Sequence, residues 1–115
     1  MSRLPLEDAI QEFETFLERQ GMRVTRQRRT VLEELYLLDR HISAEDLASL
    51  LRSKHTGISK ATVYRTLALL EESQLVEAND FNRGHRMFEF ANQTERHDHI
   101  LCVDGETIVE FKSQE

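Results

Sequence analysis

Apolar residues recur every three or four positions along the first half of the chain, the spacing expected for one buried face of a helix. Residues 6–20 show this pattern first. Residues 25–38 repeat it behind Thr25, and residues 43–51 repeat it behind Ser43, both of which are residue types favoured at helix N-caps. The pattern therefore predicts three amphipathic helices.

A fourth helical pattern covers residues 58–70 and begins at Ser59, another favourable N-cap. Its apolar residues form one narrow stripe, Val63, Leu67 and Leu70, and its opposite face carries Ala61, Tyr64, Arg65 and Ala68. Alanines let a helix backbone approach a DNA groove, and an arginine can donate two hydrogen bonds to guanine. An ordinary amphipathic helix with a solvated outer face explains the same pattern equally well.

Beyond this helix the period changes to that of short strands. Residues 75–79 and 86–90 have strand character and flank residues 82–84, Asn-Arg-Gly, which we predict to form the turn of a hairpin. The third and fourth helices, joined by a short linker, match helix-turn-helix organisation, and the hairpin adds a wing. The predicted fold class is α+β, with a winged helix-turn-helix that binds DNA.

The net charge of the whole chain does not suggest DNA binding, but the charge of its separate parts does. The 115 residues are 39% hydrophobic, enough for one globular core, and the formal net charge is −6. Residues 21–66 nevertheless carry nine basic and five acidic side chains, whereas residues 67–115 carry four basic and eleven acidic ones. The positive middle part contains the Tyr64–Arg65 face, and local charge governs contact with phosphates.

Four arginines stand close together at the start of the second helix, at positions 23, 26, 28 and 29. A solvated run of charge is one interpretation. Because the run lies beside a candidate DNA-reading helix, we favour contact with phosphate or with the minor groove.

The remaining composition indicates a cytoplasmic protein. The single cysteine, Cys102, offers no disulfide framework. No apolar run approaches the roughly 20 residues of a membrane helix, and the acidic N-terminal stretch does not resemble a secretory signal. We therefore expect no membrane partner.

The C-terminal stretch suggests metal binding. Two β-rich runs flank Asp104-Gly105, a strong signal for a two-residue hairpin turn. In that register His99 faces Glu110, and His97 lies on the same face because side chains alternate along a strand. Two imidazoles and a carboxylate make half of a divalent-metal site. A histidine-rich strand edge without metal is the alternative.

Several of these motifs, in this order, resemble the ferric uptake regulator family of bacterial metal-responsive transcription factors. The resemblance covers about residues 10 to 111 and is carried by HISAEDL at 41–47, ATVYR at 61–65, FE at 88–89, HDHILC at 97–102 and IVEF at 108–111. It implies a winged-helix DNA-binding domain over residues 1–91. Residues 92–115 would then form the hinge and first hairpin of a small α/β dimerisation domain, so that the complete protein is a homodimer.

The resemblance also implies roles for individual residues. The regulatory metal ligands would be His41, Glu89, His97, His99 and Glu110, with Asp98 belonging to a weaker second site. The DNA contacts would come from Ser59, Lys60, Thr62, Tyr64 and Arg65, with Arg23 reaching phosphate or the minor groove. Imidazole and carboxylate ligands suit Fe²⁺, Mn²⁺ and Zn²⁺ alike.

Two departures from the family pattern limit what the resemblance implies. Many members have a Cys-x-x-Cys pair that holds structural zinc, but here Cys102 is followed three positions later by Gly105. We therefore expect that zinc site to be absent. The chain also ends at Glu115, whereas family members usually continue through another helix and strands. We therefore expect a truncated or naturally short form.

The function expected from these observations is that of a repressor of metal-uptake or stress genes, which binds double-stranded operator DNA when a divalent metal occupies the hinge. A metal-independent winged-helix module that binds DNA or protein is the alternative. A metalloenzyme is disfavoured because nothing resembles a nucleophile–base pair and five ligands leave little room for a substrate. We therefore do not expect an enzyme.

Overall fold

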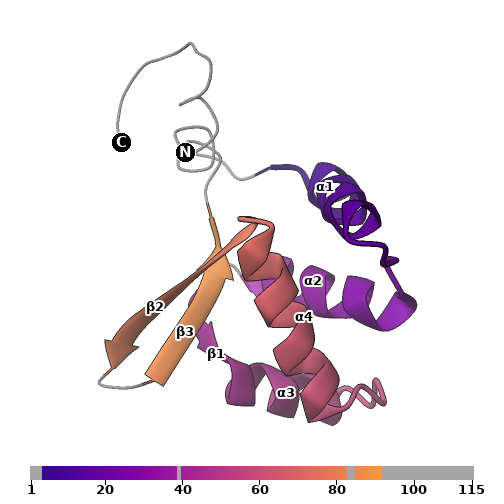
Figure 1. Cartoon of the computed structure of the whole chain (residues 1–115). Helices are drawn as coiled ribbons and strands as arrows, with labels where there is room; N and C mark the ends of the chain where they lie inside the picture. Colours follow the sequence, from indigo (N-terminus) through magenta and orange to yellow (C-terminus); the bar gives the residue numbers. More distant parts are fainter. Residues whose placement is uncertain (1–3, 39, 83–84, 92–115) are drawn as a thin grey trace, which may run out of the picture.

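The computed structural model describes residues 4–38, 40–82 and 85–91. The predicted hairpin around Asp104-Gly105 lies outside these residues. Four helices and three strands follow one another along the chain (Figure 1): α1 (Leu6–Arg19), α2 (Arg26–Leu38), β1 (Ile42–Ser43), α3 (Ala44–Ser53), α4 (Lys60–Glu72), β2 (Val76–Asn82) and β3 (His85–Phe90).

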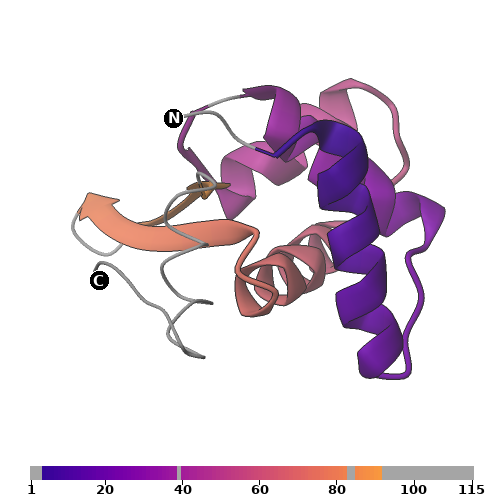
Figure 2. The same cartoon turned by 90° about the horizontal axis from the view of Figure 1, so that it is seen from above.

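The strands form one antiparallel sheet in the order β1-β3-β2. The β2–β3 hairpin projects from one side of the helices, and α1 lies on the opposite side (Figure 2). The backbone N–H of Ala91 donates to the carbonyl of Leu75 at 3.0 Å, which closes the hairpin at its base. Helices that carry a projecting hairpin confirm the predicted α+β winged-helix architecture.

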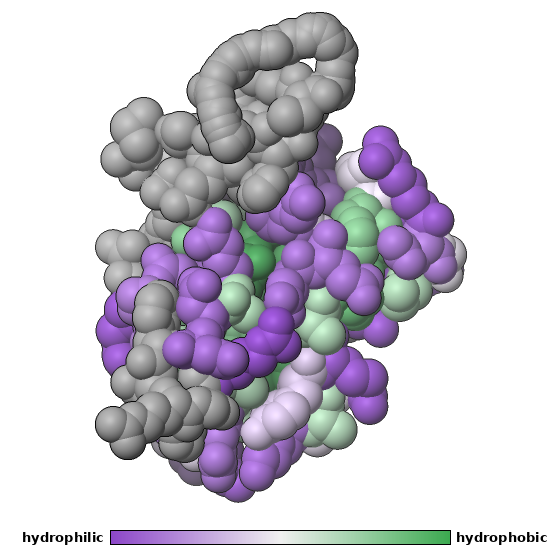
Figure 3. Space-filling model, turned by 60° about the vertical axis from the view of Figure 1, so that its left-hand side comes forward, coloured by the Kyte–Doolittle hydropathy of each residue, from purple (hydrophilic) through white to green (hydrophobic). Residues whose placement is uncertain are grey.

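The core gathers one apolar stripe from each helix. Phe13 and Leu17 of α1 are fully buried, as are Leu32 of α2, Leu47 of α3 and Val63 of α4. Hydrophilic side chains cover most of the surface seen in Figure 3, and hydrophobic ones appear only between them. Among the described residues, no helix has both the length and the apolar character required to cross a bilayer.

The predicted helix starts are confirmed by their capping hydrogen bonds. The hydroxyl oxygen of Thr25 accepts from the backbone N–H of Arg28 at 3.1 Å, and that of Ser43 accepts from Asp46 at 3.0 Å. Each bond satisfies an N–H group that has no partner within its own helix. α1 ends before Gly21, whose φ of +76° lies in the left-handed region that suits glycine.

Two local features differ from the sequence prediction. Asn82, predicted to be in the turn, belongs to β2 and pairs with His85. The register shifts between Asn79 and Asn82, and such a bulge lengthens β2 by irregular pairing that strand periodicity does not reveal. The strand β1 was not predicted, because two residues are too few to show a period.

Candidate DNA-binding face and metal-binding pair

The face of α4 that points away from the core carries the predicted DNA-reading residues. Val63, Leu67 and Leu70 are at most 1% exposed, so they fix the rotation of the helix. Tyr64 is 45% exposed, and Arg65, Ala61 and Ala68 are exposed with it. The structure thus brings Tyr64 and Arg65 together on one open surface. Small residues beside them leave the helix backbone accessible to a groove.

The predicted N-cap of α4, Ser59, is joined in shaping the first turn by Thr62, for which the sequence predicted only a DNA contact. The Ser59 hydroxyl oxygen accepts from the backbone N–H of Thr62 at 3.1 Å, and the Ser59 O–H donates to the Thr62 hydroxyl oxygen at 3.0 Å. Lys60 extends from the same turn, with its Nζ 4.0 Å from a carboxylate oxygen of Glu45 in α3. Ser59 and Thr62 therefore hold the helix start in shape, and Lys60 is the exposed cation of this turn.

The four arginines near α2 differ in whether their guanidinium groups have a partner in the structure. Arg28 donates from its guanidinium to the carbonyl of Arg23 at 2.7 Å, and Arg29 pairs with Glu33 at 3.1 Å. Within the part of the chain that the structure describes, Arg23 and Arg26 make no ion pair. Arg26 lines a hollow of about 260 Å³ that also includes His55, in the turn that leads to α4. Arg26 therefore lies close to the start of α4, the predicted DNA-reading helix.

This division leads to a testable difference in salt dependence. The log of DNA affinity falls linearly with the log of salt concentration, by about 0.9 for each neutralised phosphate. We expect Arg26→Gln to make that slope shallower by about this amount, because Arg26 lies beside the start of α4, where a bound duplex would pass. Arg29→Gln is the matched control and should change the slope less, because Arg29 does not line the hollow beside the start of α4. Fluorescence anisotropy with a short labelled duplex measures both, and equal slopes for the two variants would contradict this assignment.

A second set of predicted residues meets on the sheet. The β1–β3 register pairs Ile42 with Phe88, so the residue before β1, His41, comes opposite Glu89. His41 Nε2 and Glu89 Oε1 are in direct contact, with side chains 46% and 35% exposed. An imidazole and a carboxylate that the sequence separates by almost fifty positions therefore form one accessible pair, held by the antiparallel pairing of their strands.

The chemistry of this pair fits a divalent ion. Imidazole nitrogen and carboxylate oxygen are donors that Fe²⁺, Mn²⁺ and Zn²⁺ accept. The described residues contain no group of three or more His, Cys, Asp or Glu side chains placed to hold a metal ion, so the pair would need further ligands. The other predicted ligands, His97, His99, Glu110 and Asp98, lie outside the residues that the structure describes.

The sheet register also identifies a neighbour that sequence reasoning missed. Glu77 of β2 pairs with Glu89 of β3, so the two acidic residues occupy directly opposed positions on neighbouring strands. Like charges in directly opposed positions are unfavourable unless a cation lies near. The alternating pattern of β2 could have indicated that Glu77 faces outward, but only the register shows that it lies beside Glu89.

Comparison with known proteins identifies the family. The model of the ferric uptake regulator family matches residues 19–115. The chain is 34% identical over 106 residues to the ferric uptake regulation protein of Campylobacter jejuni, covering 90% of this chain and 67% of that protein. It is 38% identical over 100 residues to the corresponding protein of Pseudomonas aeruginosa, covering 86% of this chain and 74% of that protein.

Solved structures agree with this assignment. The Helicobacter pylori ferric uptake regulator matches with a TM-score of 0.71 at 20% identity, covering 99% of this chain and 91% of that chain, which supports the fold. The Vibrio cholerae regulator matches with a TM-score of 0.60 at 31% identity, covering 87% of this chain and 76% of that chain. The metalloenzyme alternative is excluded, because this chain belongs to the ferric uptake regulator family of metal-responsive transcriptional regulators, which are not enzymes.

Proposed function

We propose that this protein is a metal-dependent repressor acting in the cytoplasm, in which α4 reads operator DNA and a divalent-metal site controls that binding. The observation that carries the proposal is the contact between His41 and Glu89. This pair lies on the sheet of the same domain that presents Tyr64 and Arg65. A metal held there is therefore mechanically connected to the helix that meets DNA.

Relatives support a metal site of this kind. The Helicobacter pylori ferric uptake regulator has three functional metal-binding sites. The Pseudomonas aeruginosa ferric uptake regulator has been solved with manganese. For this chain we assign the regulatory site to His41 and Glu89 together with His97, His99 and Glu110, and Asp98 to a second site. These five residues would hold the cation, and the cation would supply a coordination centre that joins the two segments.

The proposed ligands come from two segments of the chain. His41 and Glu89 belong to residues 1–91, the proposed DNA-binding domain, whereas the remaining ligands belong to residues 92–115, the proposed hinge and beginning of the dimerisation domain. Ligands from both segments at one centre hold the winged helix in one orientation. In a homodimer that orientation sets the distance between two α4 helices, so metal affinity and operator affinity are reciprocally linked.

The test measures operator binding with and without metal. An operator duplex is selected from a randomised pool by the wild-type protein in Mn²⁺, a redox-stable substitute for Fe²⁺. We expect His41→Ala and His99→Ala to weaken Mn²⁺ binding and to lower operator affinity only when Mn²⁺ is present. In chelator, wild type and variants should bind the duplex alike, because none of them then has the metal-dependent connection.

A charge-matched comparison strengthens this test. Glu89→Gln removes one carboxylate ligand and should behave like the histidine variants. Glu18→Gln makes the same change in charge on the exposed surface of α1 and should keep the full response to Mn²⁺. If the ligand variants gained as much operator affinity from Mn²⁺ as wild type does, the switch would lie elsewhere. If Mn²⁺ did not change the affinity of wild type, the chain would be a metal-independent winged-helix module.

The physiological metal is accessible to direct measurement. Iron, manganese and zinc all accept the proposed ligands, and availability in the cell decides among them. Elemental analysis of the protein isolated from its own host identifies the bound ion. If the proposed regulatory site is correct, wild type contains bound divalent metal. The His99→Ala variant should contain less of it per protein chain.

A further inference from the structure

A hollow of about 360 Å³ separates the DNA-reading helix from the wing. Tyr64 and Ala68 of α4 line one side, and Arg86 and Phe88 of β3 line the other. Arg86 is the second residue of β3, so it lies close to the end of the hairpin that projects from the helices. The wing thus contributes an arginine to the same hollow that Tyr64 lines.

Arg86 is held by two neighbours. Its Nη2 donates to Glu71 Oε2 of α4 at 2.7 Å, and its guanidinium carbon lies 5.8 Å from the centre of the Phe88 ring. The Arg86 side chain is still 56% exposed, and that of Glu71 is 35% exposed. The guanidinium is therefore aligned by a carboxylate and an aromatic ring while one side of it remains open to solvent.

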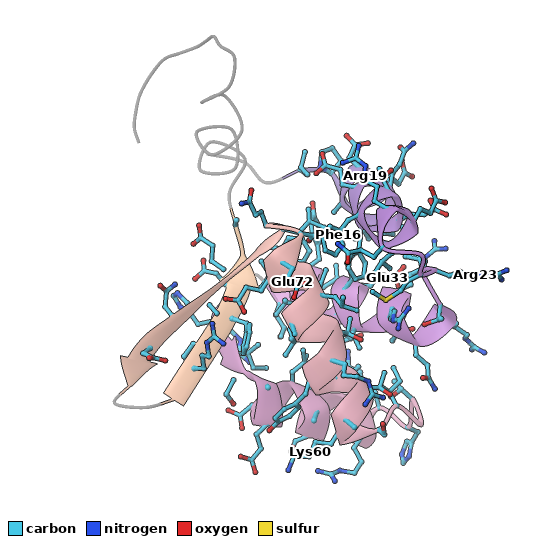
Figure 4. All side chains as sticks on the ribbon, in the orientation of Figure 1. Phe16, Arg19, Arg23, Glu33, Lys60 and Glu72 are labelled. Atoms are coloured by element: carbon cyan, nitrogen blue, oxygen red, sulfur yellow. The ribbon has the colours of Figure 1, made fainter. Side chains whose placement is uncertain are left out.

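The hairpin end and the start of α4 lie on the same side of the molecule. In Figure 1 the beginning of α4, the helix α3, the end of β2 and the beginning of β3 all occupy the lower side. Figure 4 places Lys60, in the first turn of α4, at that lower edge. A duplex contacted by Tyr64 and Arg65 from this side would therefore run past the beginning of β3.

We propose that Arg86 is a further phosphate-binding residue of the DNA interface, and that Glu71 competes with DNA for it. The inference rests on the proposed DNA-binding function of α4. In the free protein the carboxylate of Glu71 holds Arg86 against the helix. On DNA the guanidinium exchanges its hydrogen bond to this carboxylate for hydrogen bonds to a backbone phosphate, which can accept two parallel ones from an arginine.

The magnitudes favour such an exchange. An exposed ion pair contributes only about 0–1 kcal/mol to stability, so little holds Arg86 on Glu71 once a phosphate is in reach. The highly charged duplex gains by releasing condensed counterions when a cation neutralises a phosphate. Glu71 itself remains near the duplex as a negative charge. Its presence therefore lowers DNA affinity, whereas Arg86 raises it.

The test uses the full chain and a short labelled duplex of mixed sequence, because a phosphate contact does not depend on base sequence. Fluorescence anisotropy is recorded over a range of salt concentrations. We expect Arg86→Gln to weaken binding and to make the salt slope shallower by about 0.9. We expect Glu71→Gln to strengthen binding, because it leaves Arg86 without its competing carboxylate.

Two comparisons separate this role from a merely structural ion pair. Glu72→Gln removes the same charge from the next residue of α4, which is exposed, and should raise affinity less than Glu71→Gln does. In the double variant Glu71→Gln/Arg86→Gln the extra gain from Glu71→Gln should disappear. Arg86→Lys should keep most of the salt slope, because the positive charge remains.

The outcomes are distinct. If the ion pair only tied the wing to α4, both single variants would weaken binding together, and this result would overturn the inference. An unchanged slope for Arg86→Gln, with wild type binding normally and thermal stability retained, would also overturn it while leaving the proposed function intact. Failure of the wild-type chain to bind any duplex at low salt would overturn both.

Discussion

Replacing Arg65 by alanine is expected to lower operator affinity by about 1–3 kcal/mol, the contribution of one bidentate contact with guanine. Arg65 is exposed on α4, opposite the buried stripe formed by Val63, Leu67 and Leu70. The variant should therefore fold normally. The measurement is the affinity for the selected operator duplex in Mn²⁺, together with the midpoint of thermal unfolding.

Two further variants show whether Arg65 reads bases or only adds charge. Arg65→Lys keeps the positive charge but loses the planar pair of donors, so it should bind a scrambled duplex normally and prefer the operator less. Arg19→Ala removes an exposed arginine from α1, far from Lys60 in Figure 4, and should leave operator affinity unchanged. Unaltered operator affinity in Arg65→Ala, with unaltered stability, would show that this face of α4 does not read DNA.

Replacing Phe13 by alanine is expected to lower the free energy of unfolding by about 3–5 kcal/mol. Phe13 is fully buried on the inner face of α1 and belongs to the same core as Leu32 and Leu67. Truncation at this position removes an aromatic ring and leaves a cavity that rigid neighbours fill only in part. Urea denaturation followed by circular dichroism measures the loss.

Phe16 provides the matched control on the same helix. It is only half-buried, at the edge of the core, and Figure 4 labels it on the side of α1 that faces the end of α4. Phe16→Ala should therefore cost clearly less than Phe13→Ala. Equal losses would mean that α1 does not pack in the orientation described, and a negligible loss for both would mean that α1 is not part of the cooperative unit.

Helix boundaries were predictable because their determinants are local. The hydroxyls of Thr25, Ser43 and Ser59 cap helices at the positions where the sequence analysis expected them. A capping bond spans only three residues, so the sequence around it contains most of the necessary information. The buried stripe of α4 was predictable for the same reason, since helical periodicity alone places its residues on one face.

The candidate metal-binding pair depended on information of another kind. The sequence pointed to His41 and Glu89 only through resemblance to a family, because nothing local connects two residues so far apart. Their contact follows from the pairing of β1 with β3, and β1 is too short to be recognised in advance. The position of Asn82 in β2 was mispredicted for a related reason, since a bulge changes the register without changing the composition.

The same distinction applies to the charged residues. The sequence shows an arginine run at the start of α2, and only the resemblance to the family distinguished one member of it, Arg23. Packing distinguishes them, because Arg28 and Arg29 have partners within reach whereas Arg26 stands beside the turn before α4. Nothing in the sequence indicated that Arg86 would meet Glu71, fifteen positions earlier, across the hollow between wing and helix.

The sequence by itself determined the helices, their buried faces, the family and the residue types available for DNA and metal. Periodicity, capping and motifs each depend on residues that are close together in the sequence. Only the tertiary structure decided which distant residues become neighbours: His41 with Glu89, Glu77 opposite Glu89, and Arg86 with Glu71. The physical reason is that strand register and helix packing are set by the burial of the whole core, which no short stretch of sequence specifies.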